Sequence, residues 1–71
     1  MDKLHQLSDD WGFHDPIDMA ESYAFEGVYP AICMNKGCGY STEYEPDQDK
    51  GWCESCSTNT VVSAAVLLGI I

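Results

Sequence analysis

The stretches CMNKGC at residues 33–38 and CESC at residues 53–56 contain all four cysteines of this 71-residue chain. Two such pairs, joined by an insert of hairpin length, are the spacing by which short polypeptides hold one tetrahedral metal ion. A chain this short buries little apolar surface, so its stability needs support from a metal, disulfides or a partner. We therefore expect one metal ion bound by four ligands: Cys33, Cys38, Cys53 and Cys56.

The full pattern, C-x4-C-x14-C-x2-C, predicts a structural zinc site. A rubredoxin-like iron site is the alternative, since four thiolates also suit iron, although the long first knuckle argues against it. Protein ligands would fill all four positions and leave none for a catalytic water, so we expect no enzymatic activity. Nucleophilic catalysis is also unsupported, because Ser55, Ser57 and Thr58 have no plausible general base near them.

The first six residues, MDKLHQ, lack the apolar stretch that follows the basic start of a secretory signal peptide. We therefore expect the protein to stay in the cytoplasm, where thiols are kept reduced. Oxidation of the four cysteines to two disulfides, with three possible connectivities, is the weaker alternative.

The chain is strongly acidic, with 12 Asp and Glu against three Lys and Arg and a net charge of -9. Four thiolates subtract four charges and Zn²⁺ adds two, which takes the net charge of the zinc form to -11. Such a field repels phosphate, so we expect no direct binding of DNA or RNA. The acidity either keeps the protein soluble or attracts a basic protein partner. An acidic mimic of nucleic acid that inhibits a DNA- or RNA-binding enzyme remains an alternative.

Residues 1–26 contain no cysteine and are expected to form an N-terminal helical segment. Leu4 and Leu7 suit one short amphipathic turn. A second helix is predicted to begin at Asp15 as N-cap with Pro16 in the first position, and to run to about Glu26 before Gly27. Its apolar face is expected to consist of Ile17, Ala20, Tyr23 and Ala24.

Residues 27–71 are expected to form a zinc ribbon with a closing helix, packed with residues 1–26 in one domain. Residues 28–32 suggest an edge strand because Pro30 interrupts them. In the first knuckle, Gly37 and Gly39 would allow positive φ angles. Residues 40–45 alternate as a half-exposed strand, and residues 46–51 suggest a turn. Lys36 and Lys50 stand near the knuckles, where a cation offsets the charge of a zinc tetrathiolate.

The last eleven residues, 61–71, carry no charge and are too short to span a membrane. We expect a helix capped by Asn59 or Thr60, although the β-branched residues would also suit a strand. Its apolar side chains surround the helix, which suggests that surplus surface mediates self-association or docking of a partner.

Several stretches resemble small zinc-ribbon proteins of bacterial and bacteriophage genomes that have no assigned function. The resemblance covers residues 33–71, rather more than half of the chain, and the stretches that carry it most are PAICMN, EYEPDQD, GWCESC and TNTVVSA. The resemblance implies the ribbon fold, the four cysteines as ligands and a closing helix, and it implies no activity. Two departures from general zinc-ribbon knuckles are the four residues between Cys33 and Cys38, and Ser57 where a Gly often stands.

The two histidines, His5 and His14, are expected to be ordinary imidazoles, because four cysteines already complete a tetrahedral shell. The sequence thus predicts a small α+β domain stapled by metal, with an N-terminal helical segment, short antiparallel hairpins carrying two cysteine knuckles, and an apolar C-terminal helix. Its expected role is that of an acidic, non-enzymatic protein-interaction or regulatory module, with an iron electron carrier as the rival.

Overall fold

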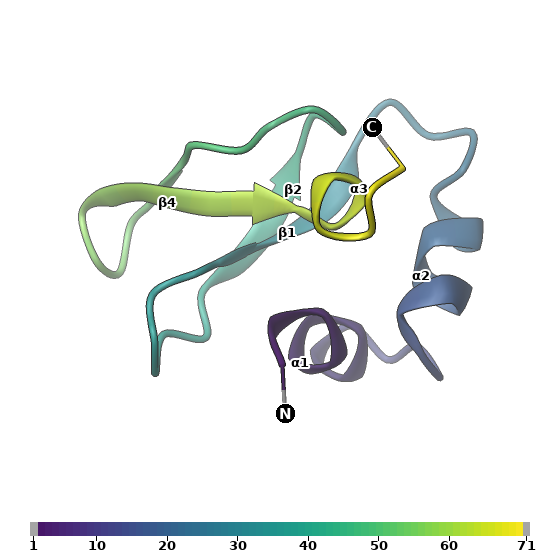
Figure 1. Cartoon of the computed structure of the whole chain (residues 1–71), viewed down its shortest axis with the longest axis horizontal. Coiled ribbons are helices and arrows are strands. Elements are labelled where there is room, and N and C mark those ends of the chain that lie inside the picture. The colour runs from purple at the N-terminus through teal and green to yellow at the C-terminus, as the bar shows by residue number, and fades with distance from the viewer. Residues whose placement is uncertain (1, 71) are drawn as a thin grey trace.

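The computed structural model describes residues 2–70 as two N-terminal helices, a four-stranded antiparallel sheet and a short C-terminal helix (Figure 1). The helices are α1 (Lys3–Asp10), α2 (Pro16–Ser22) and α3 (Ala64–Leu67). The strands are β1 (Tyr29–Cys33), β2 (Ser41–Tyr44), β3 (Gly51–Cys53) and β4 (Thr58–Ser63). The predicted α+β class is confirmed, including hairpins that carry the cysteines. No helix within residues 2–70 is long and apolar enough to cross a membrane.

The strand order is β2-β1-β4-β3, so β1 lies inside the sheet with a partner on each side. The prediction that this segment is an edge strand is therefore wrong. Met34 donates its N–H to the Thr60 carbonyl in the β4 direction, and Cys33 donates to Tyr40 in the β2 direction. By this alternation the nitrogen of Pro30 faces the β4 side. Along β1, pairing with β4 starts only at Ala31, opposite Ser63, one residue after Pro30. The missing N–H of Pro30 therefore costs no hydrogen bond of the sheet.

Both N-terminal helices begin where Asp side chains can cap them. Asp2 accepts a hydrogen bond from the backbone N–H of His5, and Asp15 accepts one from Asp18 at 2.8 Å. Pro16 occupies the start of α2, as predicted. The predicted end near Glu26 is wrong, because α2 stops at Ser22 and the chain continues in tight turns closed by hydrogen bonds between residues three apart.

The buried face of α2 also differs from the prediction. Ile17 is 59% exposed and Ala24 is exposed, whereas Met19 is fully buried beside Ala20. Tyr23 is half-buried and makes edge contacts with the rings of Trp11 and Phe13, at centroid distances of 6.2 and 6.1 Å. The helix carries apolar residues on two faces, and the aromatic contacts with α1 and the following turn select the face that holds Met19.

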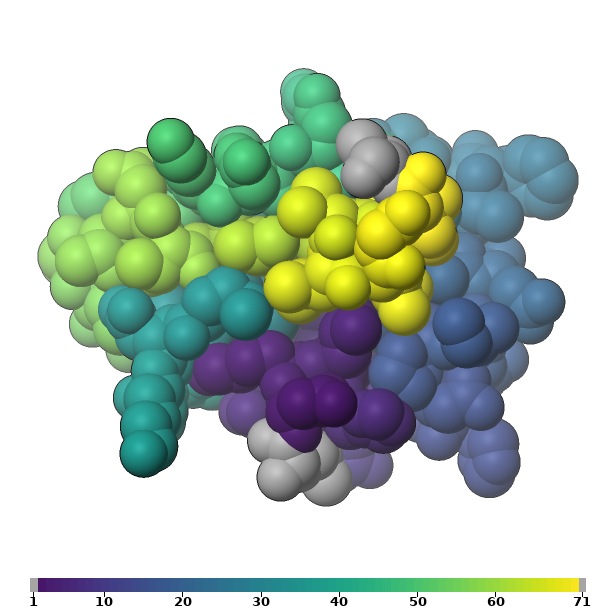
Figure 2. All heavy atoms as spheres, viewed as in Figure 1, coloured from purple at the N-terminus to yellow at the C-terminus, as the bar shows by residue number. Residues whose placement is uncertain are grey.

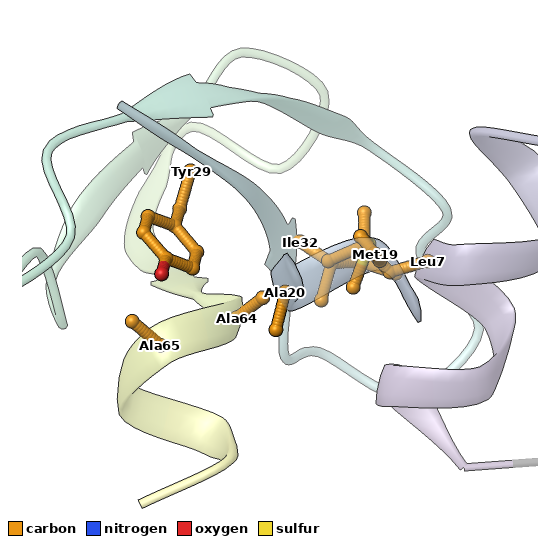
Figure 3. Packing of buried hydrophobic residues seen from close by; sticks show 7 residues of the cluster. All are labelled: Leu7, Met19, Ala20, Tyr29, Ile32, Ala64 and Ala65. Atoms are coloured by element: carbon orange, nitrogen blue, oxygen red, sulfur yellow. The ribbon is translucent and has the colours of Figure 1, made fainter. Parts of the chain in front are cut away.

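The main core lies where the three helices meet β1 (Figure 3). Its buried members come from every helix and from the central strand: Leu7, Met19, Ala20, Tyr29, Ile32, Ala64 and Ala65. A second cluster consists of Ala31, Cys33, Cys53 and Val61, with Tyr40 and Tyr44 packed against it. All five residues of β1 are buried, because this strand contributes to both clusters.

The C-terminal segment is a strand followed by a single helical turn, not the helix predicted for residues 61–71. Val61 and Val62 pair with Cys33 and Ile32 of β1, and α3 starts only at Ala64. The cap is Ser63, whose hydroxyl accepts hydrogen bonds from the N–H groups of Ala65 and Val66, so Asn59 and Thr60 do not cap the helix. The same hydroxyl donates to the Pro46 carbonyl at 2.6 Å and ties the predicted turn to the helix. Ile71, part of that prediction, lies outside the described residues.

Candidate metal centre

The two cysteine pairs stand at the ends of two strands. Cys33 is the last residue of β1 and Cys53 the last residue of β3, and Cys38 and Cys56 lie in the turns that follow. Both strands pair with β4, which brings the two turns together although 14 residues separate Cys38 from Cys53. All four sulfur atoms lie within 4.8 Å of one another, so the sheet gathers the four predicted ligands into one cluster.

The sulfur distances fit a single tetrahedral ion. A regular tetrahedron with metal–sulfur bonds of about 2.3 Å has sulfur–sulfur edges of about 3.8 Å. The Sγ atoms of Cys33 and Cys56 are 3.9 Å apart, and those of Cys38 and Cys53 are 3.8 Å apart. A disulfide requires about 2.05 Å, and all four cysteines are free thiols. The residues present therefore fit one metal ion bound between the knuckles.

The cluster is half embedded in the protein. Cys33 and Cys53 are fully buried, whereas Cys38 and Cys56 are partly exposed. The buried pair packs against Ala31 and Val61 in the second cluster. A metal bound here would join the end of the central strand to the edge strand β3, and so would act as a cross-link within the sheet.

The second knuckle has a tight turn around Cys53. The N–H of Cys56 donates to Sγ of Cys53 at 3.3 Å, and the N–H of Ser57 donates to the Cys53 carbonyl at 2.8 Å. Ser57 has a φ of 57°, the left-handed region. This is the position where a Gly often follows such a pair, and the geometry explains that preference, because a side chain there is strained.

The longer first knuckle closes with a turn in which Cys38 donates its N–H to the Asn35 carbonyl at 3.1 Å. Gly37 has a φ of 83°, as predicted. The prediction for Gly39 is wrong, since its φ is not positive. Instead, a Cβ at Gly39 would lie 3.3 Å from Nε2 of Gln6, so this glycine permits close approach of α1.

A lysine from α1 holds the first knuckle from outside. Nζ of Lys3 donates to the carbonyls of Asn35 and Cys38, at 2.8 and 2.6 Å. The sequence spacing predicts this supporting role for Lys36 and Lys50 instead, and both are exposed. Lys3 stands more than 30 residues from its acceptors in sequence, and no local pattern relates them.

Thr60, at a bulge in β4, lies beside the cluster. Trp52 pairs with Asn59 and Gly51 with Val61, so Thr60 is the extra residue on β4. Its hydroxyl lies 3.1 Å from Sγ of Cys33 and 3.0 Å from the hydroxyl of Thr58. The side-chain amide of Asn35 donates to Thr58 at 3.2 Å and so links the first knuckle to β4. These polar groups form the surroundings that orient thiolate ligands.

The thiols differ in acidity because their surroundings differ. Burial disfavours the thiolate of Cys33, but hydrogen bonds from Thr60 and the backbone of Asn35 outweigh it and lower the pKa of Cys33 to about 7. Burial raises the pKa of Cys53 to about 11. Metal binding requires thiolates, so it competes with protons at these sulfurs.

The other sequence candidates lie outside the cluster. His5 is exposed, and its Nδ1 lies 2.9 Å from Asp2. His14 is also exposed. Across residues 2–70, Cys33, Cys38, Cys53 and Cys56 form the one group of three or more metal-binding side chains that lie close enough to share an ion.

In fold and site the chain is zinc-ribbon-like: four cysteines cluster between the hairpins of an antiparallel sheet. No protein-family model, curated protein or solved structure matches this chain.

Proposed function

We propose that this chain is a non-enzymatic zinc protein in which one structural Zn²⁺ holds the fold that presents a protein-interaction surface. The observation that supports the metal is the sulfur cluster, with edges of 3.8 and 3.9 Å. Four protein ligands complete a tetrahedral shell, which leaves no position for a catalytic water. Because metal binding needs reduced cysteines, we place the protein in the cytoplasm.

The interaction role rests on surface chemistry. The chain has a net charge of -9. The interval between Lys3 and Lys36 contains no lysine or arginine but six carboxylates: Asp9, Asp10, Asp15, Asp18, Glu21 and Glu26. All six are exposed. A surface of this sign steers basic protein partners and repels phosphate. We therefore propose a basic protein as the partner of this surface and no direct binding of nucleic acid.

Metal analysis of the purified protein tests the first half of the proposal. We expect about one equivalent of zinc per chain and a colourless solution. One equivalent of iron and a red ferric form would instead identify the rubredoxin-like electron carrier, because four thiolates accept either metal. Less than about half an equivalent of any metal would contradict both.

Salt-dependent binding tests the second half. Association with a basic partner should slow as salt rises, because the Debye length falls from about 10 Å at 0.1 M to about 3 Å at 1 M. Duplex DNA and single-stranded RNA should show no micromolar binding at about 150 mM salt. Such binding would overturn the assignment of the acidic surface.

A further inference from the structure

A surface groove of about 470 Å³ lies between α1, the first knuckle and α3. Figure 2 shows the three segments meeting on one face, with α1 in purple, the first knuckle in teal and the C-terminal helix in yellow. Its volume falls within the range of about 300–1,000 Å³ that is common for ligand sites. The groove is separate from the sulfur cluster, and none of the four cysteines lines it.

The charge of the groove is opposite to that of the whole protein. Lys3 and Lys36, two of the three cationic side chains in the chain, line it, while Lys50 does not. Asp2 also lines it, but its Oδ1 is occupied by the backbone N–H and the ring of His5, both at 2.9 Å. Two cations and one engaged carboxylate therefore face the groove on a molecule that is otherwise strongly acidic.

The remaining chemistry of the groove is apolar. Leu4, Leu67 and Met34 line it, and Met34 is 40% exposed although it is a large apolar side chain. Methionine adapts its shape to different apolar partners, which suits a recognition surface. An apolar floor with two cations at its edge complements a ligand that combines apolar side chains with carboxylates.

We propose that this groove docks a peptide segment of a partner protein that combines apolar side chains with carboxylates. Apolar side chains would cover Leu4, Met34 and Leu67, and a carboxylate would pair with the ammonium of Lys36. Lys3 already donates two hydrogen bonds, to Asn35 and Cys38, and an ammonium has a third donor for the peptide. This docking site is distinct from the acidic surface, which attracts a basic partner.

Occupation of the groove stabilises the metal-bound fold. Its walls come from both ends of the chain and from the first knuckle, so one ligand would bridge all three segments. A ligand that binds the folded state but not the unfolded state raises the free energy of unfolding. The expected signature is a rise in melting temperature with peptide concentration.

The test uses ¹⁵N-labelled full-length protein with bound metal and two synthetic pentapeptides, acetyl-Glu-Leu-Leu-Glu-Leu-amide and its counterpart with Lys in place of Glu. We expect the acidic peptide to shift the amide resonances of Leu4, Met34, Gly37 and Leu67, and the basic peptide to leave them unchanged. Octanoate serves as a third probe. Shifts with octanoate and none with the acidic peptide would overturn peptide docking in favour of a small-molecule site.

Two matched pairs of variants locate the site. Lys36→Glu should weaken binding of the acidic peptide about fivefold to tenfold, whereas Lys50→Glu, the same change at an exposed lysine outside the groove, should not. Met34→Asp should abolish binding, and Ile17→Asp, at an exposed side chain on α2, should leave it intact.

Equal effects within each pair of variants would overturn the proposal. Zinc content should be unchanged in all four variants, so failure of docking is distinguishable from failure of the metal site.

Discussion

The hydroxyl of Thr60 lies 3.1 Å from Sγ of Cys33, across the boundary between β4 and β1. Thr60 is also the extra residue of the β-bulge between β4 and β3, so the contact lies at an irregular point of the sheet. Thr60 thus connects an irregularity of the sheet to the chemistry of the ligands. In the metal-bound form its hydroxyl can donate to the thiolate and stabilise its negative charge.

Replacement of Thr60 tests that connection. Thr60→Val keeps the shape of the side chain and removes the hydroxyl, so we expect metal affinity to fall about tenfold, in the range typical for groups that orient metal ligands. Thr60→Ser keeps the hydroxyl and should retain affinity within about threefold. Competition with a chromophoric chelator measures both. Equal affinity of the valine variant and the wild type would show that the hydroxyl does not support the thiolate.

Lys3 is predicted to stabilise the first knuckle through its bonds to the carbonyls of Asn35 and Cys38. Lys3→Met keeps most of the apolar stem and removes both charge-assisted bonds, so unfolding in urea should become easier by about 1.5–3 kcal/mol. Lys50→Met removes an exposed lysine and should change stability by less than about 0.5 kcal/mol. If the two variants unfold at the same urea concentration, the ammonium of Lys3 contributes nothing to the knuckle.

Replacement of Gly51 by a larger residue is predicted to lower stability, because the ring of Tyr44 covers the glycine. A Cβ at residue 51 would lie 2.6 Å from Cε2 of Tyr44, whose hydroxyl is held by the Trp52 carbonyl at 3.0 Å. Gly51→Ala should therefore cost about 1–3 kcal/mol. In a Tyr44→Ala background the same change should cost much less, and a double-mutant cycle measures the difference. Additive effects would mean that the ring is not the obstacle.

Ser57 is predicted to be a site of backbone strain. With a φ of 57°, Ser57→Gly should leave stability unchanged or raise it by up to about 1 kcal/mol. Ser57→Val should lower it by about 1–2 kcal/mol, because a β-branched residue tolerates this region poorly. Thermal melts of the two variants give the comparison, and a valine variant as stable as the glycine variant would contradict the assigned backbone geometry.

The sequence predicted best those features that short motifs specify. The cysteine spacing indicated the cluster, and Asp15 followed by Pro16 located the start of α2, because ligand spacing and helix caps act over a few residues. The predictions of where α2 ends and which face it buries were wrong, because contacts of Tyr23 with Trp11 and Phe13 determine both. Such contacts join segments whose relative position no local pattern encodes.

The C-terminal segment shows the same limit more clearly. The residue types of Val61 and Val62 are compatible with a helix or a strand. They form a strand because they pair with Cys33 and Ile32 of β1. Ser63 before Ala64 and Ala65 was a local signal for a helix start, and it marks where α3 begins. The presence of Pro30 did not reveal that β1 lies inside the sheet. A proline is tolerated at this position only because pairing with β4 does not extend to it.

The central claim is that one metal ion holds this fold together through Cys33, Cys38, Cys53 and Cys56, and titration of the reduced, metal-free protein with Zn²⁺ tests it most directly. Circular dichroism should show a largely unfolded chain that folds with an end point of one equivalent. Acid should reverse folding, because protonation of the thiolates releases the metal, and Cys53→Ser should remain largely unfolded with zinc present. A metal-free protein that is already folded, or a Cys53→Ser variant as stable as the wild type, would contradict the claim.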